Sequence, residues 1–399
     1  MLELYEEIYM NELERQLRII KSRTEEIVPE EELREKLKNS LNSGKPLKVK
    51  FGIDPTGSEL HVGHAVPLRK IKQFQELGHS IEFIIGSFTA KIGDPTGKNE
   101  TRKMMSNEDI ERNCKTYLDQ ASKIIDIDKI NLHYNGDWLS KLNFEDLLQI
   151  MANFSLSLMI SREDFAKRLK NNIPISLVEL SYPMMQAYDS VHLKSDIEIG
   201  GTDQKFNLLR GRDLQRAFGQ SPQVCLTLPI LEGTSGKDKM SKSLNNYISI
   251  KEGNRDMYGK VMSIKDELIE TYYNLVTELD DELLKEISKK MKDREISPYE
   301  AKKRLAKEIT LLYHNRELAD DAENHFDTIF SKREIPEDVE EKEIRGRDIV
   351  SLVSEEAKVS KSQARRLIAS GAIKIDGITV NELKPGIIKI GKKIIFKIK

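Results

Sequence analysis

The sequence predicts an α/β protein whose largest part is an open parallel sheet flanked by helices. Three short apolar runs, at 47–53, 81–85 and 197–199, each end in a cluster of small residues and turn formers. Helical patterns separate these runs, and such an alternation of strand and helix is typical of a parallel sheet. A helical region follows, and short β runs after residue 372 predict a small α+β domain at the end of the chain.

The first strand–loop–helix unit carries several candidate functional side chains. The run at 47–53 breaks at 54–57, where Asp, Pro, Thr and Gly favour a turn, and a helical pattern begins near His61. Ligands of parallel sheets bind beyond the carboxyl ends of the strands and against helix N-termini. The segment 61–64, His-Val-Gly-His, is therefore expected to border a nucleotide phosphate site together with Gly52 and Asp54. Taken alone, the two histidines fit equally well as surface residues at a helix start.

The next two strands end in similar groups of polar residues. Thr89 and Asp94 follow the strand at 81–85 and should face the same crevice, where an acid could hold a cation such as an ammonium group. The alternative for Asp94 is a surface Asp-Pro turn. The strand at 197–199 leads into paired glycines and Asp203, a carboxylate suited to ribose hydroxyls.

A predicted helix carries a further set of polar side chains. Tyr182, Gln186 and Asp189 stand at i, i+4 and i+7, so they share one helix face. A solvated face is one interpretation, but the neighbouring Met184 and Met185 favour burial. Buried polar groups need partners, and a ligand can be that partner.

A lysine-rich loop follows the strand predicted at 224–230. It contains two glycines and the lysines Lys237, Lys239 and Lys242. Such a loop can close over a triphosphate and neutralise its developing charge. In isolation, a loop of this composition is more often exposed to solvent and inert.

The pattern along the chain predicts several domains and one apolar patch. The patch at 154–160 is either core or a subunit interface, which the sequence does not distinguish. The predicted parts are an N-terminal helical extension outside the sheet (1–46), the sheet domain (47–248) with a helical insertion (about 106–180), a helical domain (249–334), an acidic linker (335–344) and the small C-terminal domain (345–399).

The composition favours a cytoplasmic globular protein. Charged residues make up 33% and hydrophobic residues 38% of the 399 residues, and no apolar run approaches the roughly 20 residues of a membrane span. The acidic N-terminus lacks the pattern of a signal peptide. Cys114 and Cys225 lie far apart, so we expect two free thiols and no metal site.

The net charge of −2 is unevenly distributed. Residues 345–399 contain 13 Lys and Arg against 5 Asp and Glu, a net +8, so residues 1–344 carry −10. A basic tail on an acidic body suggests contact with a polyanion. An ordinary solvated surface is the alternative that charge alone leaves open.

Two of these segments together resemble the paired signature of class I aminoacyl-tRNA synthetases. They are His-Val-Gly-His at 61–64 and Lys-Met-Ser-Lys-Ser at 239–243. Four further stretches are similar to those of the bacterial tyrosyl-tRNA synthetase family: 52–56, 92–95, 182–189 and 200–204. In the tail, 359–368 and 371–373 resemble the S4 RNA-binding module.

The resemblance implies a Rossmann-like catalytic domain and assigns a role to individual residues. Catalysis is assigned to His61, His64, Lys239 and Lys242. ATP binding is assigned to Gly52, Asp54, Thr56, His61, Gly63, His64, Gly201, Asp203, Met240 and Lys242. Tyrosine binding is assigned to Thr89, Asp94, Tyr182, Gln186, Asp189 and Gln204. RNA binding is assigned to Lys361, Arg365, Arg366 and Lys374.

The reaction implied is formation of tyrosyl-adenylate from L-tyrosine and ATP, followed by transfer of tyrosine to the end of tRNA(Tyr). Mg²⁺ would be carried in by ATP, with no tightly bound metal, and the resemblance implies a homodimer that binds neither membrane nor DNA. Lys50 departs from the family, because many members place there a tyrosine that contacts the phenol of the substrate. The alternatives are a tryptophanyl-tRNA synthetase, an adenylyltransferase of the same superfamily and a non-catalytic RNA-binding paralogue.

Overall fold

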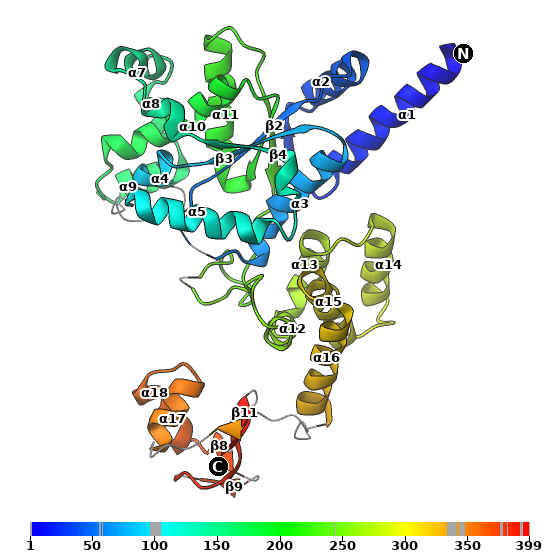
Figure 1. Ribbon diagram of the computed structural model, residues 1–399, viewed down its shortest axis with the longest axis vertical. Coiled ribbons are helices and arrows are strands. Elements are labelled where there is room, and N and C mark those ends of the chain that lie inside the picture. Colours follow the sequence, from blue (N-terminus) through cyan, green and yellow to red (C-terminus); the bar gives the residue numbers. More distant parts are fainter. Residues whose placement is uncertain are drawn as a thin grey trace. The chain divides into compact units, whose positions relative to one another are not determined.

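A computed structural model of the protein separates into two compact units (Figure 1). Unit 1 comprises Met1–Glu252 and Lys260–Ile309, and unit 2 comprises Gly253–Gly259 and Thr310–Lys399. The structure describes residues 2–55, 57, 59–95, 105–242, 244–332, 341–342, 348–375, 378–380, 382–391 and 394–398.

A six-stranded sheet in the order β1-β6-β5-β2-β3-β4 forms the centre of unit 1. Strands β2 to β6 run parallel, and β1 pairs antiparallel with β6. The strands are β1 (Glu26–Val28), β2 (Lys48–Ile53), β3 (Ser80–Ile85), β4 (Ile130–Tyr134), β5 (Ile197–Gly201) and β6 (Val224–Leu228). The predicted α/β class and parallel sheet are confirmed.

Two strands lie where the sequence predicts helical segments outside the sheet. β1 belongs to the stretch 1–46, whose remainder forms α1 (Leu2–Lys21) and α2 (Glu30–Ser43). β4 lies inside the predicted helical insertion. Both predictions were wrong because neither strand contains a long apolar run that would reveal it in the sequence. β1 has only three residues, and β4 is a half-exposed strand at the edge of the sheet.

Helices cover both faces of the sheet. Successive side chains of a strand point to opposite faces. Phe83 of β3 packs against Tyr117 of α5, with ring centroids 6.2 Å apart, whereas Lys50 of β2 binds Gln186 of α10. In Figure 1, α3 (Val62–Glu76) and α5 (Asn107–Ala121) accordingly lie on one face, and α10 (Leu177–Leu193) and α11 (Lys205–Ala217) on the other.

The helical insertion packs into the core beside α10. Its short helices are α6 (Gly136–Leu139), α7 (Phe144–Met151), α8 (Leu156–Ile160) and α9 (Glu163–Lys170), and α4 (Thr89–Ile92) precedes them. Within the patch at 154–160, Phe154 and Met159 are buried in this core, whereas Leu156 is 65% exposed. Part of the patch is therefore core. Exposed apolar side chains occur on α7 and also at Leu156, Leu169 and Leu177.

Helices make up most of the chain between the sheet and the tail. They are α12 (Asn254–Met262), α13 (Ile269–Val276), α14 (Asp281–Lys292), α15 (Pro298–Tyr313) and α16 (Arg316–Phe326), with short helical turns at Asp266–Leu268 before α13 and at Asp327–Lys332 after α16. Two further short helical turns lie in the sheet domain, at Ile127–Lys129 before β4 and at Thr202–Gln204 after β5. The helical domain predicted at 249–334 is divided between the two units, because α13 and α14 belong to unit 1 and α16 to unit 2.

The tail has a small core of its own. Helices α17 (Ile349–Glu356) and α18 (Lys361–Ala369) pack against a sheet in the order β7-β11-β10-β8-β9. Its strands are β7 (Glu341–Lys342), β8 (Ile373–Ile375), β9 (Ile378–Thr379), β10 (Gly386–Ile390) and β11 (Ile394–Ile398). This arrangement matches the two helices and short strands expected from the sequence.

Candidate active site

A cavity of about 710 Å³ lies at the carboxyl ends of the central strands. It collects the predicted catalytic, ATP-binding and tyrosine-binding residues that the structure describes. They are Gly52, Asp54, His61, Gly63, His64, Thr89, Asp94, Tyr182, Gln186, Asp189, Gly201, Asp203, Gln204, Lys239, Met240 and Lys242. Thr56 and Ser243 lie outside the described residues.

His61 and His64 lie ring against ring at the start of α3, with the ring planes tilted by 32°. The backbone N–H of His61 donates to His64 Nδ1 at 3.2 Å, and the two ring centroids are 3.8 Å apart. Burial lowers the pKa of His61 to about 2 and that of His64 to about 4, with the nearby Lys242 ammonium adding to both shifts. Both rings are therefore neutral near pH 7 and can donate N–H groups to a phosphate.

Asp54 accepts two hydrogen bonds at the end of β2. Thr89 Oγ1 donates to its Oδ1 at 2.7 Å, and Tyr182 Oη donates to its Oδ2 at 2.9 Å. A Cβ atom at position 86 would lie 2.0 Å from Asp54 Oδ1, so only Gly86 leaves room for this carboxylate. Burial raises the pKa of Asp54 to about 7 in spite of the two donors. From the resemblance, Asp54 is expected to contact ATP and Tyr182 the amino acid. In the structure these two side chains are hydrogen-bonded to each other.

Asp94 is bound to two side chains of the cavity wall. Arg162 Nη2 donates to its Oδ1 at 3.1 Å, and Gln204 Nε2 donates to its Oδ2 at 2.6 Å. Arg162 is only 5% exposed and also donates to Asn207 Oδ1 at 3.2 Å. Neither Arg162 nor Asn207 was identified from the sequence, because Arg162 immediately precedes α9, Asn207 lies within α11, and neither stands in a distinctive motif.

Asp189 lies at the buried end of the cavity and is 3% exposed. Trp138 Nε1 donates to its Oδ1 at 2.8 Å, and Asn135 Nδ2 donates to its Oδ2 at 3.2 Å. Burial raises the pKa of Asp189 to about 6, and the Lys50 ammonium acts against this rise. Trp138 is itself stacked on His192, with ring centroids 4.3 Å apart. The sequence identifies the acceptor Asp189 but not the two donors that hold it.

The lysine-containing loop at 237–242 borders the cavity and is held by ion pairs and hydrogen bonds. Lys239 Nζ lies 3.4 Å from Asp203 Oδ2, and Lys242 Nζ lies 3.2 Å from Glu59 Oε2. Asn246 fixes the loop by accepting from the Ser241 N–H at 2.8 Å. Lys239 is exposed and Lys242 is half-buried, and a polyphosphate could replace the carboxylate partner of each lysine.

The predicted RNA-binding residues lie outside this cavity, in the tail. Lys361, Arg365 and Arg366 are exposed on α18, and Lys374 is exposed on β8. Lys389 of β10 is in register with Lys374, which brings a further basic residue beside it. Lys389 was not singled out from the sequence because it lies in a strand of alternating apolar residues.

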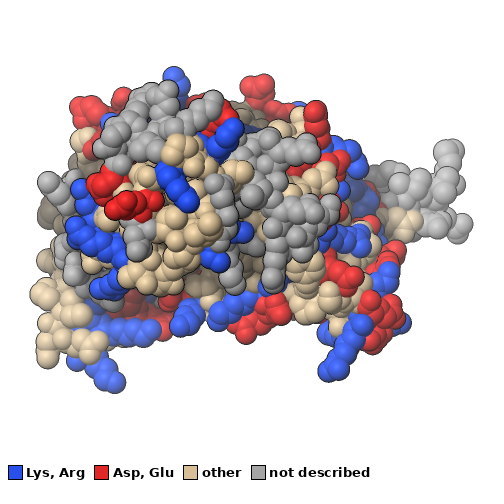
Figure 2. All heavy atoms as spheres, turned by 90° about the horizontal axis from the view of Figure 1, so that it is seen from below, with Lys and Arg blue, Asp and Glu red and all other residues tan. Residues whose placement is uncertain are grey.

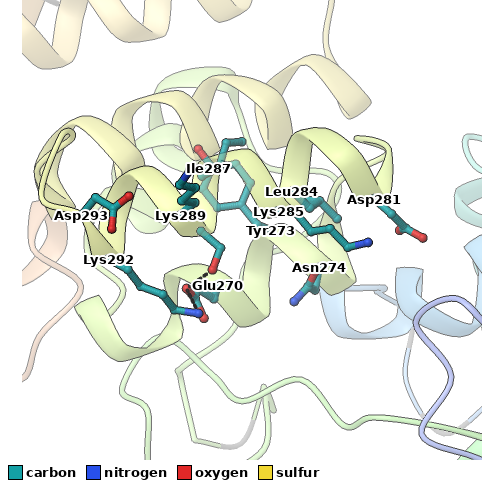
Figure 3. A pocket seen from close by; sticks show the side chains of 11 residues that line it. Glu270, Tyr273, Asn274, Asp281, Leu284, Lys285, Ile287, Lys289, Lys292 and Asp293 are labelled. Carbon is teal, nitrogen blue, oxygen red and sulfur yellow. Dashed lines mark hydrogen bonds and ion pairs between the residues drawn. The ribbon is translucent and has the colours of Figure 1, made fainter.

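A second cavity, of about 490 Å³, lies between α13 and α14 (Figure 3). Glu270 accepts from Ser288 Oγ at 2.6 Å and lies 3.9 Å from Lys292 Nζ. No predicted site residue lines it. Within the described residues, no group of three or more His, Cys, Asp or Glu side chains is placed to hold a metal ion, and no helix is long and apolar enough to cross a membrane.

Comparisons with known proteins agree with this geometry. Residues 42–331 match the family of tRNA synthetases class I (W and Y). The chain is similar to tyrosine–tRNA ligase of Carboxydothermus hydrogenoformans, with 49% identity over 98% of both chains. It is 50% identical to that of Moorella thermoacetica, over 93% of this chain and 91% of the relative.

Solved structures share the fold at low sequence identity. The tyrosyl-tRNA synthetase of Archaeoglobus fulgidus, complexed with L-tyrosine, aligns with a TM-score of 0.63 at 23% identity, over 78% of this chain and 99% of that chain. A truncated mitochondrial tyrosyl-tRNA synthetase of Aspergillus nidulans also gives a TM-score of 0.63, at 20% identity, over 81% of this chain and 94% of that chain.

Proposed function

The chain belongs to the class I tRNA synthetases, in their bacterial tyrosine–tRNA ligase branch, and from this premise we propose how its residues divide the reaction. The enzyme activates L-tyrosine with ATP to tyrosyl-adenylate and transfers the tyrosine to tRNA(Tyr), releasing pyrophosphate and AMP. The observation that carries the proposal is one cavity holding a neutral histidine pair, two lysines and a buried carboxylate.

Tyrosine would bind with its phenol toward Asp189 and its ammonium toward Asp94. The Asp189 carboxylate accepts the phenol proton, while Trp138 and Asn135 keep its oxygens in place. Tyr182 and Gln186 complete the amino-acid site, with Thr89 and Gln204 beside them. Arg162 and Gln204 already bind Asp94, so the substrate ammonium shares or displaces these contacts.

The substrate carboxylate would attack the α-phosphate of ATP, with pyrophosphate as the leaving group. Catalysis is then positioning and charge stabilisation, with no covalent enzyme intermediate. His61 and His64 donate to the phosphate oxygens at the N-terminus of α3, and Lys239 and Lys242 neutralise the pyrophosphate. Asp203 binds the ribose, with Gly52, Asp54, Gly63, Gly201 and Met240 bordering the nucleotide, and Mg²⁺ enters as part of the ATP substrate.

The tail would bind the tRNA through phosphate contacts. Lys361, Arg365, Arg366 and Lys374 are exposed, and the tail has a net charge of +8. On the face drawn in Figure 2, Lys and Arg side chains are interspersed with Asp and Glu. Because charges of both signs are mixed on this face, we attribute tRNA binding to these four positions rather than to the whole face. The affinity for tRNA should fall as the salt concentration rises, since binding releases counterions from the phosphates.

The protein would work in the cytoplasm, where ATP and tRNA are both present.

Two chains would form a twofold homodimer through the helical insertion. Phe144, Leu148 and Met151 stand at i, i+4 and i+7 on α7 and are 74%, 50% and 42% exposed. An exposed apolar stripe of this kind marks an interaction surface. Sedimentation at micromolar concentration should give twice the chain mass, and Phe144→Glu should give monomers; a monomeric wild-type protein would refute the dimer.

ATP–pyrophosphate exchange with each of the twenty amino acids tests the activity as a whole. Tyrosine alone should support rapid exchange. Exchange driven by tryptophan would point to a tryptophanyl-tRNA synthetase, the other member named in the family description. RNA binding without exchange for any amino acid would point to a non-catalytic paralogue.

A further inference from the structure

We propose that Lys50 and Glu198 form a buried positioning pair that holds Gln186 and the adjoining turn of α10 in the geometry that binds the amino acid. The proposal rests on the function proposed above and concerns the wall of the tyrosine site. Neither residue is assigned to touch the substrate. Their effect would be exerted through Gln186.

The pair lies on two neighbouring strands, and both side chains belong to the wall of the cavity. Lys50 of β2 is in register with Glu198 of β5, and the two side chains are 1% and 2% exposed. Lys50 Nζ lies 2.9 Å from Glu198 Oε1. On its other side, Lys50 is in register with Glu82 of β3, whose carboxylate is bound by His133, Ser80 and Asn131. A lysine therefore stands between two acidic residues in a row across the sheet.

All three protons of the Lys50 ammonium have acceptors. Besides Glu198, it donates to the backbone oxygen of Gln186 at 2.8 Å and to Ser190 Oγ at 2.7 Å. Gln186 and Ser190 are one turn apart on α10, so Lys50 ties this turn to the sheet. The departure noted from the sequence, a lysine in place of a phenol-binding tyrosine, therefore serves the protein interior rather than the substrate phenol.

Glu198 orients the side chain of Gln186 directly. Gln186 Nε2 donates to Glu198 Oε1 at 3.0 Å, and Gln186 Oε1 accepts from Asn207 Nδ2 at 2.9 Å. Ser190 Oγ donates to Glu198 Oε2 at 3.2 Å, which closes the network around the ion pair. Both ends of the Gln186 amide are thus fixed before any ligand arrives, an arrangement that favours binding by pre-organisation.

Lys50 also acts on the carboxylate of Asp189 at the buried end of the cavity. Asp189 follows Gln186 by three residues on α10, and the Lys50 ammonium counteracts the burial that raises the pKa of Asp189. Loss of Lys50 would leave Glu198 buried without its counter-charge, and a buried unpaired charge forces its neighbours to rearrange. The turn that carries Gln186 and Ser190 is bound to both Lys50 and Glu198, so we expect this turn to shift.

The experiment measures KM for tyrosine and for ATP by pyrophosphate exchange in three variants. Lys50→Met should raise the tyrosine KM by about tenfold or more while the ATP KM changes by less than about twofold. The double variant Lys50→Met with Glu198→Gln removes both charges, so it should raise the tyrosine KM by only about threefold. Lys70→Met is the matched control, because Lys70 is 3% exposed and donates to the backbone oxygens of Ile19, Ile20 and Ser22, away from the cavity.

The control should lower the melting temperature and leave the ratio of the two KM values unchanged. A Lys50→Met enzyme that behaves like Lys70→Met would overturn the proposal, as would a double variant no better than the single one. If Lys50→Met does not fold, the double variant tests the proposal by itself. A tyrosine KM equal to that of the wild type in the double variant would refute a positioning role for the pair. Absence of tyrosine-dependent exchange in the wild type would instead refute the proposed function.

Discussion

Trp138 donates its indole N–H to Asp189 Oδ1 at 2.8 Å, at the buried end of the cavity. This bond, with the one from Asn135, fixes a carboxylate that burial alone would make unfavourable. Asp189 keeps further acceptor capacity on both oxygens, since an ionised carboxylate offers about four lone-pair sites. A phenol can use that capacity and a phenyl ring cannot.

Replacing Asp189 by alanine should therefore reduce discrimination against phenylalanine by roughly a hundredfold or more, because the acceptor for the phenol is lost. The measurement is the ratio of kcat/KM for tyrosine and phenylalanine in pyrophosphate exchange. Asp213→Ala, which removes a half-exposed carboxylate on α11, serves as control and should leave the ratio unchanged. An unaltered ratio in Asp189→Ala would place the specificity determinant elsewhere.

The pH dependence of tyrosine use should report the ionisation of Asp189. Its pKa is raised to about 6, so protonation below that pH removes the phenol acceptor and kcat/KM for tyrosine should fall. The Trp138 hydrogen bond lowers this pKa, so Trp138→Phe should move the acid limb to higher pH. A limb that stays in place, or moves to lower pH, contradicts this assignment.

Asp54 should make the enzyme less stable as the pH rises. Its pKa is about 7 in the folded protein against an ordinary value of 3.8, so the folded state binds the proton more tightly and stability falls as pH rises between these values. The neutral histidines act in the opposite direction, and Asp54→Asn isolates the carboxylate. Relative to wild type, this variant should gain about 1 kcal/mol or more in unfolding free energy from pH 5 to 8. A pH-independent difference in urea unfolding would disprove the shift.

His64→Asn should slow adenylate formation by about a hundredfold and leave tyrosine affinity nearly unchanged, because the imidazole stabilises charge that develops on phosphate. Single-turnover adenylate formation and equilibrium tyrosine binding provide the two measurements. His314→Asn is a suitable control, because His314 follows the end of α15 and does not line the cavity. An equal loss of tyrosine binding would give His64 a structural role instead.

Deleting residues 345–399 should abolish most tRNA charging and preserve tyrosine-dependent pyrophosphate exchange. The described lining of the catalytic cavity ends at Lys242, and the tail has its own core. If the tail only braces the rest of the protein, the melting temperature and both activities should fall together. A truncated enzyme that charges tRNA at the full-length rate would exclude the RNA-binding proposal.

The sequence predicted those elements whose signals lie within one short stretch of the chain. The strand at 48–53 and the helix that starts at Val62 follow from an apolar run, a turn and a helical period within 30 residues. The site residues on these elements could be named because their strand ends converge on one edge of the sheet. β1 could not, because its three residues are strand only through pairing with Cys225–Thr227, about 200 positions away.

The hydrogen-bond partners of the site residues could not be predicted from the sequence either. Nothing near Trp138 in the sequence shows that its N–H reaches Asp189, 51 positions later. Arg162 meets Asp94 across a separation of 68. Such contacts depend on how the insertion folds back over the sheet, which a local period does not encode.

The short strand Glu26–Val28 protects the protein against aggregation, which should become apparent when the N-terminal residues are removed. All five residues of β6, Val224–Leu228, are buried, and β1 is the strand that covers their outer side. A protein shortened beyond Val28 would expose a row of free backbone donors and acceptors on an apolar strand, the template on which further chains add. Proteolytic clipping of the N-terminus should thus convert a well-behaved enzyme into one that precipitates, although its cavity retains every residue.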